Sequence, residues 1–134
     1  MLERKFTSYL TKFLTEERNK ILLVNGARQI GKSYLIRYAG RKLFSHFVEI
    51  NLKEDIEGDK VFADVRTTDD LYMRLSNYCP TPLGDNTDTL VFLDEIQSYP
   101  HLMTMLKFLN QESRYRFIAS GSQLGVALAQ TPSV

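Results

Sequence analysis

A glycine-rich segment near the amino end has the residue types and spacing of a phosphate-binding loop. Residues 26–33 read Gly-Ala-Arg-Gln-Ile-Gly-Lys-Ser, that is, glycine, four residues, glycine, lysine and serine. The glycines permit backbone turns that aim successive N–H groups at phosphate oxygens, at the positive end of the following helix. Lys32 would neutralise β- and γ-phosphate charge, and Ser33 would place its hydroxyl on Mg²⁺. We predict a phosphate site made by Gly26, Ala27, Arg28, Gln29, Ile30, Gly31, Lys32 and Ser33.

Two adjacent carboxylates follow a second apolar run. Residues 90–93 read Leu-Val-Phe-Leu, and Asp94 and Glu95 come directly after them. At the carboxyl end of a parallel strand, where ligands bind, Asp94 can hold Mg²⁺ and Glu95 can orient and polarise an attacking water. The pair favours hydrolysis of a nucleotide over phosphoryl transfer to a small acceptor, which stays open as an alternative.

Small polar residues follow a third apolar run. Residues 116–119 lead into Ser120, Gly121 and Ser122. A hydroxyl at this position could sense the γ-phosphate or hold the attacking water, and Ser120 is the first candidate. Gln97 could also reach that water, although a polar residue on a loop explains it equally well.

The elements that must position these residues can be predicted from apolar periodicity. An amphipathic helix is expected over 2–14, a buried strand over 21–25, a helix over 33–43 and a strand over 47–52. The order strand, glycine loop, helix, strand is a βαβ unit, which requires a parallel sheet. Farther along we expect a helix capped by Thr67 or Thr68, a strand over 89–93, a helix opened by Pro100 and a strand over 116–119. Residues 53–66 show no clear period.

Composition limits the class of protein. The chain has 134 residues, 43% hydrophobic and 25% charged, with a net charge of +1, which suits one globular domain. Its longest apolar runs are far shorter than the ~20 residues of a membrane helix. Cys79 is the single cysteine, so no internal disulfide forms. With no secretory signal at the amino end, these features favour a cytoplasmic location.

Three motifs together resemble a known family. GARQIGKS, FLDEIQ and IASGSQ, in this order and separation, are similar to the AAA-type P-loop ATPases of a bacterial and archaeal group with an uncharacterised carboxyl-terminal domain. The resemblance implies ATP and Mg²⁺ as ligands and a three-layer α/β fold with a mainly parallel sheet. The strand before Ser120 would lie between the loop strand and the acidic strand. Residues 1–134 would form one P-loop ATPase domain, with the helix over 2–14 leading into its core. By this resemblance Gly26, Gly31 and Lys32 would bind phosphate, and Ser33 and Asp94 would bind magnesium. Lys32 and Glu95 would act in catalysis, and Ser120 would sense the γ-phosphate.

The chain departs from this family after residue 125. The family continues with a further strand, an arginine for the γ-phosphate and a second domain. We therefore expect an amino-terminal fragment that lacks its last strand and has its own carboxyl-terminal region as a partner. The absent strand would flank residues 21–25, so this strand is expected at an open edge that promotes self-association.

Two functions are favoured, a Mg-dependent ATP hydrolase and a nucleotide-binding interaction module that does not turn ATP over. A GTPase is disfavoured because Asn19-Lys20 is followed by Ile21-Leu22 and not by a guanine-reading Asp. A zinc site has no support, since His46, His101 and Cys79 lack ligand spacing. Nucleic acid is not indicated, because the basic residues after Ser33 are interpreted as a solvated helix face without interleaved aromatics. Those basic residues are Arg37, Arg41 and Lys42.

Overall fold

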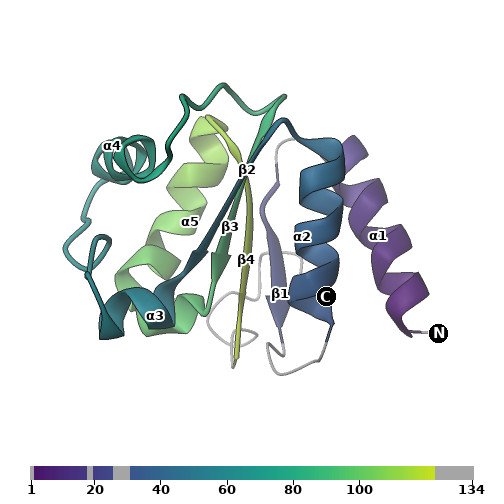
Figure 1. The fold of residues 1–134 in the computed structure, drawn as a ribbon, viewed down its shortest axis with the longest axis horizontal. Coiled ribbons are helices and arrows are strands. Elements are labelled where there is room, and N and C mark those ends of the chain that lie inside the picture. The colour runs from purple at the N-terminus through teal and green to yellow at the C-terminus, as the bar shows by residue number, and fades with distance from the viewer. Residues whose placement is uncertain (1, 18–19, 26–30, 123–134) are drawn as a thin grey trace.

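Four parallel strands form the centre of the molecule. The structure, a computed structural model, describes residues 2–17, 20–25 and 31–122. The strands are β1 (Leu22–Asn25), β2 (His46–Asn51), β3 (Thr89–Asp94) and β4 (Arg116–Gly121). Their order in the sheet is β1-β4-β3-β2, and every pairing is parallel (Figure 1). The predicted α/β fold is confirmed, including the position of β4 between the loop strand β1 and the acidic strand β3.

Helices cover both faces of this sheet and make a three-layer structure (Figure 1). On one face lie α1 (Leu2–Glu16) and α2 (Lys32–Leu43). On the other lie α3 (Leu52–Glu57), α4 (Thr68–Tyr78) and α5 (Pro100–Glu112), with the short 3₁₀ helix η1 (Ile96–Ser98) after β3. Pro100 is the first residue of α5, as predicted.

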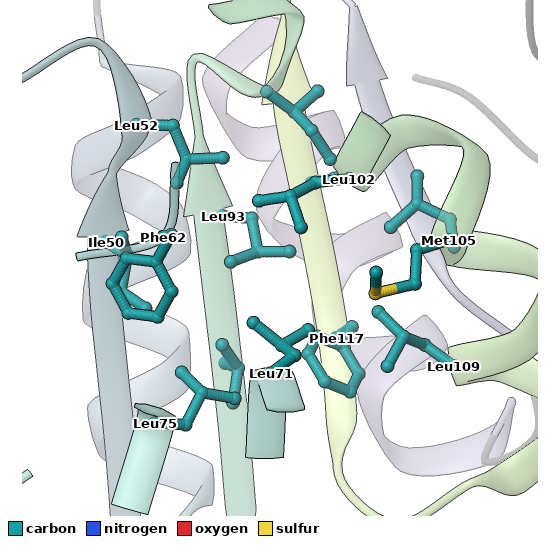
Figure 2. Packing of buried hydrophobic residues seen from close by; sticks show 14 of the residues in the cluster. Ile50, Leu52, Phe62, Leu71, Leu75, Leu93, Leu102, Met105, Leu109 and Phe117 are labelled. Atoms are coloured by element: carbon teal, nitrogen blue, oxygen red, sulfur yellow. The ribbon is translucent and has the colours of Figure 1, made fainter. Parts of the chain in front are cut away.

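Side chains on the two faces of the sheet pack into two separate hydrophobic cores. In β3, Val91 and Leu93 pack toward α4 and α5, whereas Leu90 and Phe92 pack toward α1 and α2. Figure 2 shows the first of these cores, where side chains from helices and strands interdigitate around Leu93. All six residues of β3 are buried, which explains why this strand reads as a continuous apolar run and not as an alternating one.

Two local details differ from the sequence prediction. The second strand begins and ends one residue earlier than expected. It ends at Asn51 because Leu52 is the first residue of α3. The Asn51 side chain accepts a hydrogen bond from the backbone N–H of Glu54 at 3.0 Å and so caps α3, a helix that periodicity did not predict. The cap of α4 is Thr67, which accepts from the N–H of Asp70 at 3.1 Å.

Strand β1 is at the edge of the sheet within the residues that the structure describes, where its pairing partner is β4. This agrees with the position expected for residues 21–25. Self-association through this edge, and a carboxyl-terminal region as partner, stay predictions.

Candidate nucleotide site

Two of the predicted site residues meet at the carboxyl ends of neighbouring strands. Asp94 is the last residue of β3, and the register that pairs Leu93 with Ala119 places Ser120 of β4 beside it. The Ser120 hydroxyl Oγ donates a hydrogen bond of 2.6 Å to Asp94 Oδ1. Ser120 is 2% exposed and Asp94 is 8% exposed, so this contact is shielded from solvent. The carboxylate and the hydroxyl thus lie together at the carboxyl ends of the strands, where parallel α/β folds bind ligands.

The second part of the site is the start of α2. Gly31 has φ 97° and ψ −18°, a left-handed conformation that glycine adopts without steric cost. Lys32 and Ser33 are the first two residues of α2. At the start of a helix the backbone N–H groups have no partner within the helix, and the helix dipole favours anions. Lys32 Nζ donates to the backbone oxygen of Asn25 at 3.4 Å, which ties the start of α2 to the end of β1. The other predicted loop residues lie outside the described part of the chain: Gly26, Ala27, Arg28, Gln29 and Ile30.

An aromatic residue of α1 also contacts the predicted phosphate lysine. Lys32 Nζ lies 5.6 Å from the centre of the Phe6 ring, within the range of a cation–π interaction. Phe6 is buried against the core on that side of the sheet. The ammonium group of Lys32 therefore lies between a backbone carbonyl and an aromatic ring.

The environment of Asp94 suits a bound cation. Burial raises the pKa of this carboxyl above its ordinary value, and the neighbouring charges of Glu95 and Glu49 act in the same direction. The hydrogen bonds from Ser120 Oγ and from the Glu95 N–H lower the pKa but do not outweigh burial. A divalent cation would stabilise the charged form. Asp94 and Ser33 supply a carboxylate and a hydroxyl oxygen, the donor types that Mg²⁺ prefers, so these residues fit the ion.

Glu95 has an unusual backbone conformation, which determines the direction in which its side chain leaves the chain. Its φ is 58° and its ψ is 45°, a left-handed conformation that costs a residue other than glycine of order 1–3 kcal/mol. Gln97 Nε2 donates to Glu95 Oε2 at 2.8 Å, and Gln97 Oε1 accepts from the Ser122 N–H at 3.3 Å. A Cβ atom at Gly121 would meet Gln97 Oε1, so a side chain at this position would push the Gln97 amide group aside. Gln97 therefore links the carboxylate of Glu95 to the end of β4.

Comparison with known proteins identifies the family. Residues 18–133 match the sequence model of a family described as an AAA domain. The chain belongs to this AAA domain family. Membership makes it a nucleotide-binding module of the ATPase type. The narrower bacterial and archaeal group, and its carboxyl-terminal domain, stay predictions.

A solved structure shares the fold of this AAA domain. The structure of PCH-2 from C. elegans superimposes with a TM-score of 0.56 at 15% sequence identity, over 96% of this chain and 39% of that chain. At this identity the likeness shows a shared fold only, and the chain spans less than half of the PCH-2 chain. The search of curated proteins gave no significant match.

Four of the predicted site residues lie in two places in the AAA domain. Asp94 and Ser120 touch across β3 and β4, and Lys32 and Ser33 open α2 beside β1. Sequence reasoning missed Phe6, because its helical spacing indicates only that it is buried. No described helix of the AAA domain is long and apolar enough to cross a membrane.

Proposed function

We propose that this AAA domain binds ATP with Mg²⁺ and hydrolyses it to ADP and phosphate. The observation that carries the proposal is the hydrogen bond between Asp94 and Ser120 at the ends of β3 and β4. Strand β4 is the neighbour of β1, which precedes the predicted phosphate loop. Lys32 and the N–H groups that start α2 would hold the β- and γ-phosphates. Ser33 and Asp94 would hold Mg²⁺, which when bound neutralises phosphate charge.

Glu95 has the role of the base in this proposal. Its carboxylate would orient a water in line with the γ-phosphorus and accept a proton from it as the new oxygen–phosphorus bond forms. The bond from the γ-phosphorus to the bridging oxygen breaks, and the electron pair leaves with ADP. Ser120 would sense the γ-phosphate through its contact with Asp94.

A second candidate function has one observation in its favour. Gln97 already engages Oε2 of Glu95, which is the group that would take the proton. If the carboxylate stays in this contact when ATP is bound, the domain holds ATP without turning it over and acts as a nucleotide-dependent interaction module.

Fluorescent-nucleotide titration and phosphate release separate these functions. We expect Mg-ATP binding that is lost in Lys32→Ala and kept in Lys53→Ala, which removes an exposed lysine from α3 on the far side of the sheet. We expect Glu95→Gln to keep binding and to lose phosphate release, whereas Glu57→Gln, at an exposed position of α3, keeps both. Binding without release in the wild type would favour the interaction module, and binding unchanged by Lys32→Ala would contradict the phosphate site.

A further inference from the structure

The outer face of α2 combines exposed aromatic and basic side chains. Tyr34 is 62% exposed and Tyr38 is 56% exposed, although rings of this size are usually half-buried or more. They surround a surface depression of about 450 Å³ together with three basic residues, Arg37, Arg41 and Lys42. The sequence predicts a solvated basic face without interleaved aromatics. The face is exposed, but the prediction of no interleaved aromatics is wrong, because both tyrosines line the same depression as the basic residues.

Helix geometry explains why the two residue types alternate. The positions 34, 37, 38, 41 and 42 follow the spacing of three and four residues that repeats on one side of a helix. Tyr34 and Tyr38 are one turn apart, about 6 Å along the axis, with Arg37 and Arg41 beside them. This stripe is distinct from the phosphate site, which lies at the amino end of the same helix.

The charge of the stripe is positive and largely uncompensated. Helix α2 carries four basic residues and no acidic one, although the chain as a whole is nearly neutral. Arg37 is committed to a two-pronged ion pair, in which its Nε and an Nη donate to Glu49 at 2.6 and 2.8 Å. Arg41 lies 5.9 Å from the Phe47 ring, and in the described part of the chain neither Arg41 nor Lys42 forms an ion pair.

We propose that the outer face of α2 binds single-stranded nucleic acid. Tyr34 and Tyr38 would stack on two successive unpaired bases, and Arg41 and Lys42 would contact the phosphates. Single strands are bound without sequence preference by exposed aromatic rings interleaved with cations. Every base can stack on a ring, and every phosphodiester group carries a negative charge. An acidic peptide would use the cations but leave two rings without a partner. A duplex keeps its bases stacked on one another and away from the tyrosines.

Fluorescence anisotropy with a labelled oligothymidylate of about 20 nucleotides, at about 50 mM salt, tests this proposal. The titration is made without ATP, so that binding of the oligonucleotide does not depend on ATP binding. A duplex of the same length and a polyglutamate peptide serve as competitors. We expect the single strand to compete best.

Variants of the stripe distinguish stacking from charge. Replacing both tyrosines, Tyr34→Ala with Tyr38→Ala, should weaken binding about 30-fold or more, from stacking of at least about 1 kcal/mol per base. Tyr34→Phe with Tyr38→Phe keeps both rings and should keep binding. Arg41→Gln with Lys42→Gln should reduce the slope of log affinity against log salt by about 1.4, because two phosphate contacts are removed.

A matched control comes from the opposite side of the sheet. Lys107→Ala with Phe108→Ala removes an exposed cation and an exposed ring, 53% accessible, from α5 (Figure 1). This variant should bind like the wild type. The proposal is overturned if the wild type does not bind the single strand, if the α5 control loses as much as the tyrosine variant, or if the duplex or the peptide competes better.

Discussion

A buried arginine at the start of β4 holds the end of α1, and its removal should destabilise the domain strongly. Arg116 is 3% exposed. Its Nη atoms donate to the backbone oxygens of Leu14 at 2.8 Å, Phe13 at 3.3 Å and Glu17 at 2.9 Å. These carbonyls lie in and just after the last turn of α1, where the helix dipole favours a cation. The Phe13 oxygen also accepts the backbone N–H of Glu17 at 2.9 Å. The guanidinium group thus caps a helix that is far away in sequence.

The cost of Arg116→Met follows from these contacts. Each hydrogen bond from a charged donor contributes about 1.5–3 kcal/mol net, so three bonds would exceed 4 kcal/mol if they were independent. Methionine also removes the unfavourable burial of a charge, which offsets part of the loss. We expect a net loss of about 3 kcal/mol. For a chain of this size that corresponds to a decrease in Tm of roughly 12 °C.

Urea denaturation followed by circular dichroism measures this loss. At an m value of about 2 kcal/mol/M, the midpoint should fall by about 1.5 M. Arg116→Lys should lose roughly half as much, because an ammonium group keeps the charge but cannot span three carbonyls as a planar fork does. Arg114→Met is the matched control, since this exposed arginine lies over the rings of Tyr72 and Tyr115, and it should cost under about 1 kcal/mol. Equal midpoints for Arg116→Met and Arg114→Met would refute the capping argument.

Two further predictions concern the candidate site. Gln97→Ala should lower kcat for phosphate release about tenfold with KM nearly unchanged, because the Glu95 carboxylate loses its orientation while the phosphate contacts remain; an increase in kcat in steady-state assays would show instead that Gln97 withholds the base. Asp94→Asn should make the nucleotide-free domain more stable at neutral pH, because both described hydrogen bonds to Oδ1 can be kept. Since burial raises the pKa of Asp94, the folded state binds the proton more tightly, so this carboxyl stabilises the fold at low pH and the contribution is lost as pH rises through its folded pKa. Urea unfolding from pH 4 to pH 7.5 should show the advantage of Asp94→Asn growing with pH, and a constant difference would contradict the assignment.

The sequence predicts those parts of the fold in which burial follows a simple period. Strand β3 is buried at every position, and the apolar residues of α5 repeat at helical spacing, so both could be recognised from residue types alone. The segment after β2 could not, because contacts between side chains and the backbone organise it. Asp55 accepts hydrogen bonds from the N–H groups of Val61 and Phe62 at 3.0 Å and from the Tyr99 hydroxyl at 2.7 Å. Such contacts leave no periodic pattern in the sequence.

The same distinction applies to the candidate site. Spacing predicted Lys32 and Ser33, because a phosphate loop is continuous in sequence. The family resemblance predicted that the strand before Ser120 lies next to the acidic strand, and the structure adds the hydrogen bond between Ser120 and Asp94. The restraint on Glu95 depends on a side chain two residues away and on the backbone of Ser122, and a side chain at Gly121 would push the Gln97 amide group aside. Nothing in the residue types of this stretch specifies which amide oxygen meets which N–H group.

Helix α1 has more than a covering role, because its two ends contact different parts of the site framework. At its carboxyl end the helix is fixed by Arg116, on the strand that carries Ser120. At its amino end Phe6 lies against Lys32. In the proposed ATP complex, Lys32 would leave the Phe6 ring and the Asn25 carbonyl to reach phosphate, so nucleotide binding would displace a contact that α1 provides. Arg116 attaches the carboxyl end of this helix to β4, and core packing fixes Phe6 at the other end, so both ends of α1 are held against the framework of the site.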